Sequence, residues 1–222
     1  MNIKIIATLL ALPLLAACAP QVESTIYVAD VEKVLADGTA LETPALLRIP
    51  QSGEEDCKKG LAGLIEKVRA LAPVTGKGQC VILDGDQLAE VETVVQIVTA
   101  TSSYVPANLF ALVVAPAGEG HASLSFKVLK PIDEIIKAIA SDDAPSTDFK
   151  PTKFVLHLNN DGRGSVDLVP GETFVDNEPH LAGGPPVTLQ RRGEVAILFS
   201  DVAAAFTEKG NSYNFATVAV SD

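Results

Sequence analysis

Acidic side chains and a histidine lie close together towards the C-terminal end of the chain. Glu172, Asp176, Glu178 and His180 occur within nine residues of one another. Carboxylate oxygens and imidazole nitrogens are ligands for hard and borderline cations, so this stretch could hold a metal ion. The same composition is typical of a solvated loop in an acidic protein. Glu178 and His180 are therefore candidates for a metal-dependent site, with the solvated loop as the simpler interpretation.

Nucleophilic catalysis needs a nucleophile, a base and an orienting group in one place. The chain has three histidines, His121, His157 and His180, and none lies beside a Gly-x-Ser-x-Gly motif. His157 is surrounded by apolar residues, which is typical of a strand histidine that faces outward or is satisfied at the core edge. Gly76-Lys77-Gly78 lacks the spacing of a phosphate-binding loop. We therefore assign no catalytic residue and no cofactor, and the sequence favours a protein that is not an enzyme.

The N-terminal segment carries the most specific pattern in the sequence. Lys4 precedes an apolar run that extends to Ala17, and such a run is typical of a secretory signal and too short to span a bilayer. The run ends in Leu15-Ala16-Ala17-Cys18, which resembles the lipobox of bacterial lipoproteins. The alternative is an ordinary secretory signal followed by an unrelated cysteine.

The lipobox resemblance implies a defined mature form. In that family the signal is removed before the cysteine, so residues 1–17 would be cleaved and Cys18 would carry acyl chains. Two or more chains are enough for stable anchoring to a membrane. Ala19 in place of aspartate implies transfer to the outer membrane, facing the periplasm, in a Gram-negative host.

Cys57 and Cys80 remain once Cys18 is assigned to the anchor. An even pair of cysteines in an exported protein predicts a disulfide, while two reactive thiols are the alternative. Removal of Lys4 with the signal leaves 16 basic and 28 acidic residues, a formal net charge of −12. This acidity argues against nucleic acid as a partner and against electrostatic adhesion to anionic lipids.

Two helices are expected from apolar periodicity. Leu61, Leu64, Ile65, Val68 and Leu71 follow helical spacing after an acidic start and before Pro73. A second helix is expected after Pro131, with Ile132, Ile135, Ile136 and Ile139 on one stripe, and a short one over Asp201–Phe206.

The remaining runs predict eight to ten strands. They include a β-branched run over 91–98 and a hairpin that turns at Asp161-Gly162. Asn159–Gly162 superficially matches the start of a calcium loop, but the hairpin explains these residues. We expect a loop from Pro170 to Pro186.

These elements predict an α+β fold with a largely antiparallel sheet and two main amphipathic helices. The expected organisation is a signal peptide over 1–17, a lipidated tether over 18–24 and a globular domain over 25–222. A candidate subdivision lies near 141–150.

The function expected is that of a lipid-anchored envelope protein with a binding or structural role, whose partner is another envelope protein. Its plan is similar to that of small envelope lipoproteins of phage and prophage origin, some of which block a receptor. The alternatives are a solute-binding lipoprotein, although 205 mature residues are short for two lobes, and a metal-dependent hydrolase.

Overall fold

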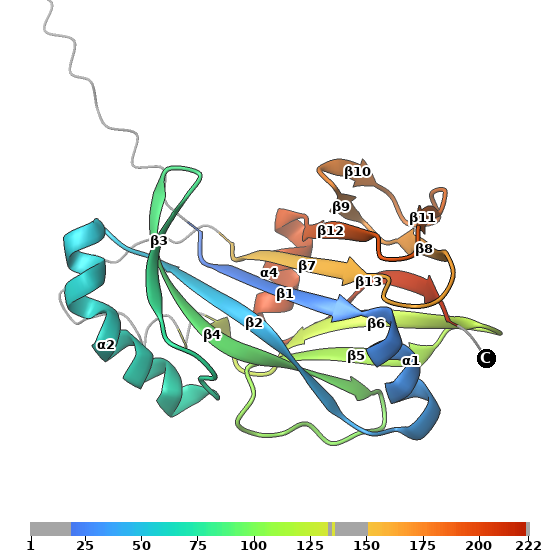
Figure 1. Ribbon diagram of the computed structural model, residues 1–222, viewed down its shortest axis with the longest axis horizontal. Helices are drawn as coiled ribbons and strands as arrows, with labels where there is room; N and C mark the ends of the chain where they lie inside the picture. The colour runs from blue at the N-terminus through green and yellow to red at the C-terminus, as the bar shows by residue number, and fades with distance from the viewer. Residues whose placement is uncertain (1–18, 133–134, 136–150, 221–222) are drawn as a thin grey trace, which may run out of the picture.

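One large curled sheet dominates the computed structural model, which describes residues 19–132, 135 and 151–220 (Figure 1). Strands contain 46% of the described residues and helices 21%. The expectation of an α+β fold with two main helices is therefore wrong. The described sheet curls into a half-barrel, and three short helices accompany it.

The described sheet has thirteen strands. Their bounds are β1 (Gln21–Tyr27), β2 (Leu41–Pro50), β3 (Gln79–Leu83), β4 (Asp86–Thr99), β5 (Phe110–Pro116), β6 (His121–Val128), β7 (Lys153–Asn159), β8 (Val166–Pro170), β9 (Thr173–Val175), β10 (Glu178–His180), β11 (Val187–Leu189), β12 (Glu194–Phe199) and β13 (Ser212–Ala219). Twelve follow the order β10-β9-β12-β7-β1-β2-β4-β5-β6-β13-β8-β11, and β3 pairs with β4 beside this path. The β1–β7 and β4–β5 pairs are parallel, and the other described pairs are antiparallel.

The curl is closed by a short corner between β8 and β9. These strands are consecutive in the chain but lie near opposite ends of the sheet order. At the corner, Gly171 N–H donates to Phe215 O at 2.7 Å. A Cβ on Gly171 would lie 3.0 Å from Asn214 O and 3.2 Å from Phe215 O, so a side chain there would crowd β13. Glycine lets the chain cross from one end of the sheet to the other at this point.

Aromatic rings fill the inside of the half-barrel. Phe126 lies at the centre, with ring centroids 6.0 Å from Phe110, 5.4 Å from Phe154 and 6.0 Å from Phe199. Phe199 also contacts Phe215 at 5.6 Å. Buried aromatic residues remove large areas from water and add ring–ring attraction, so this cluster stabilises the half-barrel together with the aliphatic core.

Helix α2 (Glu54–Leu71) confirms the first predicted helix. Leu64 and Val68 are buried on its inner face, and Glu54, Glu55 and Asp56 occupy its first turn. Acidic side chains there complement the positive end of the helix dipole.

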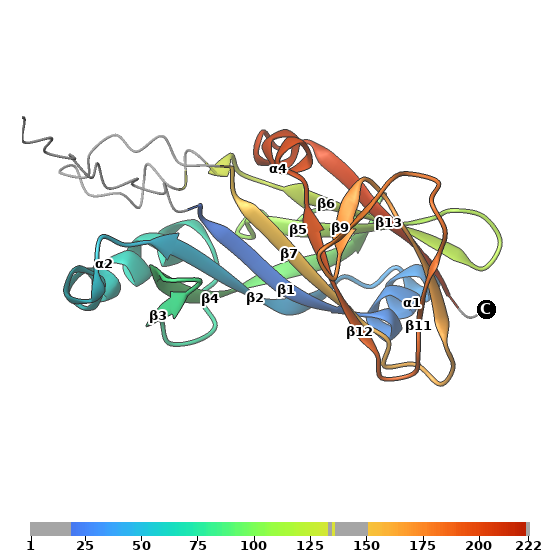
Figure 2. The ribbon, with the colours of Figure 1, turned by 90° about the horizontal axis from the view of Figure 1, so that it is seen from above.

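Helix α4 (Asp201–Glu208) confirms the predicted short helix. Ser200 caps it by accepting a hydrogen bond from Ala203 N–H. The helix lies over the end of the half-barrel where β1 and β7 begin (Figure 2).

Helix α1 (Val28–Asp37) was not expected from the sequence. Val28, Val31 and Val34 are buried on one side of it, and Gly38 ends it in the left-handed conformation. Its N-terminus is satisfied from far along the chain, because Ala29 N–H donates to Asp161 Oδ1 at 3.0 Å. Local sequence carries no sign of this cap.

Other expectations fall partly outside the described residues. Ile132 and Ile135 are helical and buried, and Ile135 N–H donates to Pro131 O at 3.2 Å. Ile136, Ile139 and the candidate subdivision near 141–150 lie outside the described residues. The expected loop over 170–186 contains the β9–β10 hairpin, which turns through Asp176 and Asn177 at positive φ.

Candidate functional site

A projecting unit stands beside the half-barrel at the end where β1 begins (Figure 1). It consists of α2, β3 and the turn between β3 and β4, and we call it the wing. The antiparallel β3–β4 pair turns at Asp84 and Gly85, both at positive φ. Such a two-residue turn suits the twist of a hairpin.

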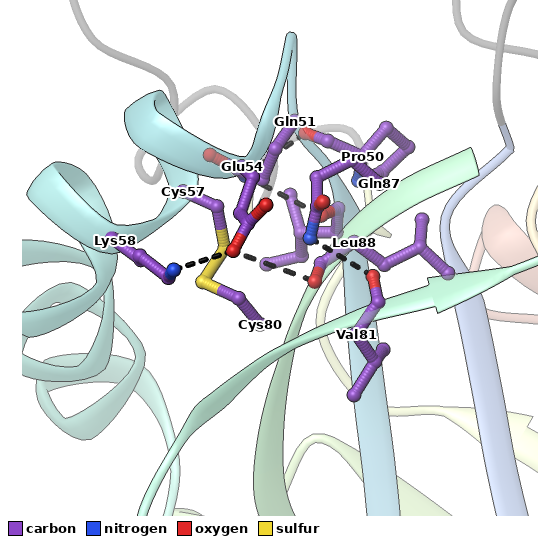
Figure 3. Close-up of a disulfide and its surroundings, with 10 residues drawn as sticks. Pro50, Gln51, Glu54, Cys57, Lys58, Cys80, Val81, Gln87 and Leu88 are labelled. Carbon is purple, nitrogen blue, oxygen red and sulfur yellow. Dashed lines mark hydrogen bonds and ion pairs between the residues drawn. A yellow bond between two sulfur atoms is a disulfide. The ribbon is translucent and has the colours of Figure 1, made fainter. Parts of the chain in front are cut away.

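A disulfide joins the two elements of the wing. Cys57 in the first turn of α2 is bonded to Cys80 in β3, with Cα atoms 6.1 Å apart (Figure 3). This confirms the predicted disulfide. Next to it, Gln87 Nε2 donates to Val81 O at 3.0 Å, and Gln51 N–H donates to Gln87 O at 2.8 Å. The wing therefore has a fixed geometry at the point where α2, β2, β3 and β4 meet.

The tip of the wing exposes apolar side chains. Ile82 is 70% exposed and Leu83 is 36% exposed, whereas Cys57 on α2 is fully buried. β3 thus receives little stabilisation from its own burial. Its position depends on pairing with β4 and on the disulfide.

A row of polar side chains crosses the other face of the sheet. Arg48 Nε on β2 donates to Glu90 Oε2 on β4 at 2.7 Å, and Arg48 also pairs with Glu23 on β1. Gln79 Nε2 on β3 donates to Glu90 Oε1 at 2.6 Å. Burial alone would lower the pKa of Arg48, but its hydrogen bonds and attraction to the two glutamates raise it on balance. The guanidinium is therefore charged and firmly held.

His157 on β7 extends this row towards β12. Its Nε2 lies 3.2 Å from Glu23 Oε1, and its Nδ1 lies 3.2 Å from Glu194 Oε1. The carboxylates are on opposite sides of the imidazole, so they do not converge on one position. The row Glu194, His157, Glu23, Arg48, Glu90 and Gln79 therefore links β12, β7, β1, β2, β4 and β3 as a network of cross-strand pairs. Its ion pairs connect strands of the half-barrel, and its last hydrogen bond, Gln79 to Glu90, joins β3 of the wing to β4.

The residues first considered for metal binding do not form such a cluster. Glu178 and His180 lie on the short strand β10, where they pair with Val175 and Thr173. Asp176 Oδ1 accepts a hydrogen bond from Ala196 N–H at 2.9 Å. This bond joins the β9–β10 turn to β12. Among the described residues, no group of three or more histidine, cysteine, aspartate or glutamate side chains is placed to hold a metal ion.

The second acidic turn is also occupied by local bonds. Asn160 Oδ1 accepts from Gly162 N–H at 3.1 Å, and Asn160 Nδ2 donates to Gly164 O at 2.8 Å. Asp161 caps α1 as described above. The expected hairpin at Asp161-Gly162 is wrong, because β7 pairs with β1 and β12, whereas β8 pairs with β11 and β13. The stretch is a turn between two strands that are distant in the sheet order.

A shallow pocket of about 290 Å³ lies at the opposite end of the half-barrel from the wing. Glu32 and Leu35 of α1, Gly118, His121 and Val220 contribute to its lining. His121 Nδ1 lies 2.7 Å from Glu119 O, so this ring is held by its own turn. Sequence reasoning did not bring these residues together, because α1 was not expected.

A family model for a domain of unknown function, DUF7424, matches residues 20–222. The chain belongs to the DUF7424 family. The DUF7424 domain includes both the half-barrel and the wing, and it begins two residues after Cys18. No curated protein and no solved structure gives a significant match to it. None of the helices in the described part of the domain is long and apolar enough to cross a membrane.

The functional features that sequence reasoning missed are on the wing and in the polar row. The exposed tip of β3 could not be distinguished from a buried strand, since Cys80-Val81-Ile82-Leu83 is apolar throughout. The row left a weak signal, because Arg48 interrupts the apolar run Ala45-Leu46-Leu47-Arg48-Ile49 of the DUF7424 domain. The pairing of Arg48 depends on the strand order.

Proposed function

We propose that this chain is a lipid-anchored envelope protein that acts by non-covalent binding to another envelope protein, with the wing as its contact surface. The single observation that carries the proposal is the position of the wing at the end of the half-barrel where the chain follows Cys18. Lipidation of Cys18 comes from the lipobox resemblance. In a Gram-negative host, Ala19 favours the outer membrane, facing the periplasm.

The ordered chain begins very close to Cys18. Pro20 O accepts a hydrogen bond from Lys153 N–H at 2.8 Å, and β1 begins at Gln21. The tether expected over 18–24 is therefore mostly strand. Two residue steps separate Cys18 from Pro20, a reach of at most about 7 Å. A chain anchored through Cys18 would hold the domain directly against the membrane surface.

The register of the sheet places the wing at the end of the half-barrel where β1 begins. Gln21 is the register partner of Arg48, Arg48 is the partner of Glu90, and Glu90 is the partner of Gln79. From that level β3 continues four residues to Leu83, about 13 Å along the strand. A chain that runs back from Gln21 to Cys18 covers a similar distance. The exposed wing tip would thus lie close to the membrane, where envelope proteins present their surfaces.

The chemistry of the tip suits a protein contact. Ile82 and Leu83 are apolar and exposed, while Asp84 and Asp86 flank them at the turn. Acidic side chains oppose insertion of this turn into anionic lipid, so a protein surface is the better partner. Because the disulfide fixes the strand in advance, little conformational entropy is lost when a partner binds.

The anchor is tested by intact mass and membrane fractionation of the wild-type chain beside Cys18→Ser. A lipid-sized mass increase and membrane location, both lost in Cys18→Ser, are expected. A soluble wild-type chain without lipid would contradict the proposal.

The contact surface is tested by placing a photo-crosslinking amino acid at Ile82 in the envelope. The matched control is Val202 on α4, which is 82% exposed and also apolar. An adduct at position 82 whose mass shows a different envelope protein, not a second copy of this chain, and no such adduct at 202 are expected. Equal adducts at both positions, or none at position 82, would contradict a role for the wing.

A further inference from the structure

Three strands of the described sheet have an open edge, and they differ in how that edge is protected. β10 pairs only with β9, β11 only with β8, and β3 only with β4 among the described residues. β10 has three residues and contains Glu178 and Pro179, and β11 also has three residues and follows Pro185-Pro186. Short length, charge and proline are the usual protection against pairing with another chain.

β3 has none of these protections. Its five residues, Gln79–Leu83, include no charge and no proline, and its last two side chains are exposed. An open strand edge offers unpaired N–H and C=O groups that only another extended backbone can satisfy along its length. The edge is also held rigidly by the Cys57–Cys80 disulfide.

We propose that β3 pairs antiparallel with β3 of a second copy of this chain, centred on Val81, so that the two wings form one continuous sheet across a two-fold axis. The proposed function does not require this contact. The inference rests on the proposed function in one respect: lipid anchoring would concentrate the copies on a membrane.

The turn determines the register of this pairing. In a two-residue hairpin the flanking residues, Leu83 and Asp86, form a hydrogen-bonded pair, and the pattern alternates along the strand. Cys80 and Ile82 then direct their backbone groups to the open edge. Pairing centred on Val81 places Cys80 opposite Ile82 of the second copy and satisfies both residues at once. A contact between identical patches on two copies is the usual basis of a two-fold dimer.

Charge at the two ends of β3 is self-complementary. Lys77 is exposed just before β3, and Asp84 and Asp86 lie at its other end. Antiparallel pairing brings Lys77 of each copy beside the acidic turn of the other. This offsets part of the repulsion expected between two acidic chains, each of formal net charge −11 in the full sequence.

Membrane anchoring favours this contact. A two-fold axis along the membrane normal keeps both Cys18 anchors on one side of the dimer. The contact is small, so association of free chains is expected to be weak. Confinement to a surface raises the effective concentration towards the millimolar range, about where weak contacts become populated.

The test is sedimentation equilibrium of the purified full-length chain in mild detergent, at concentrations up to about 1 mM. A reversible monomer–dimer equilibrium is expected for the wild type. Ile82→Lys should weaken it by about tenfold or more, because the substitution places a charge on the pairing edge. Val202→Lys makes the same chemical change on α4 and should leave the equilibrium unchanged. A monomeric wild type, or equal behaviour of the two variants, would overturn the proposal.

Exchanging the charges at positions 77 and 86 distinguishes a loss of dimer contact from a loss of folding. Lys77→Glu and Asp86→Lys should each weaken the dimer several-fold, and the double variant should restore it, since opposite charges again face each other. Failure of the double variant to recover would overturn the proposed register. The intact mass of the same sample reports lipidation independently, so loss of the anchor and loss of the dimer are separate results.

Discussion

Five phenylalanine rings pack inside the half-barrel, whereas α2 of the wing buries three side chains and is joined to β3 by a disulfide. The half-barrel is stabilised mainly by removal of apolar surface from water, which grows with the size of the core. α2 joins the same hydrophobic core through Cys57, Leu64 and Val68, and the disulfide adds a covalent link to β3. We therefore expect the half-barrel to depend mainly on burial and the wing to depend more on its disulfide.

The largest effect should come from the centre of the half-barrel. Phe126→Ala removes a ring that is fully buried among three others. The cavity and the lost burial should lower the free energy of unfolding by about 3–5 kcal/mol. Urea denaturation followed by circular dichroism measures this. A loss below about 1 kcal/mol would be typical of a surface position and would contradict the assignment of the core.

Removal of the wing disulfide should have the next largest effect. Cys57→Ser with Cys80→Ser opens a loop of 23 residue steps. In the chain-entropy model this costs about 3 kcal/mol. Denaturation of the variant beside the oxidised wild type measures the difference. An unchanged midpoint would show that α2 and β3 are held by their packing alone.

Breaking the polar row should lower the free energy of unfolding somewhat less than removal of the disulfide. Arg48→Met leaves Glu90 without its cation, and the two side chains are only 11% and 9% exposed in the native pair. An uncompensated carboxylate at this burial should lower stability by about 2–3 kcal/mol. Lys58→Ala breaks the exposed Lys58–Glu54 pair on α2 and serves as the control, with stability expected to stay near wild type. Equal losses in both variants would mean that the buried row has no special role.

A small gain is expected on the exposed face of α2. Gly63 lies inside this helix, and a Cβ there would meet no atom within 4 Å. Gly63→Ala should therefore stabilise the protein by about 0.5–1 kcal/mol, because alanine loses less backbone freedom on folding. Thermal unfolding measures the shift. A loss of stability would indicate that this face of α2 is already in contact with another surface.

Local sequence predicted α2, the disulfide and many strands of the half-barrel, but not the order of those strands in the sheet. The apolar periodicity of α2 and the Cys57–Cys80 pair are encoded within about thirty residues, so both could be recognised. The curl of the sheet depends on contacts between distant segments, such as the parallel pairing of β1 with β7 and the corner at Gly171. Helix α1 was missed because its N-terminal partner, Asp161, is 132 residues away.

In the candidate site too, the features that depend on local sequence were predicted and those that depend on strand order were not. The disulfide was predicted because cysteine pairs are recognisable from type and number alone. The ion-pair row was not, because Glu23, Arg48, Glu90 and His157 lie on four strands whose order cannot be inferred from spacing. Exposure of Ile82 depends on which edge of the sheet is left open, and that also follows from strand order.

Native-state hydrogen exchange tests the division into half-barrel and wing most directly. The comparison is between the oxidised wild type and the Cys57→Ser, Cys80→Ser double variant under conditions where both are folded. The account predicts that amides of α2, β3 and the adjoining part of β4 lose protection in the variant. Amides of β6, β7 and β12 around the aromatic cluster should remain protected. A uniform loss of protection across both regions would contradict the account, because the wing and the half-barrel would then unfold as one unit.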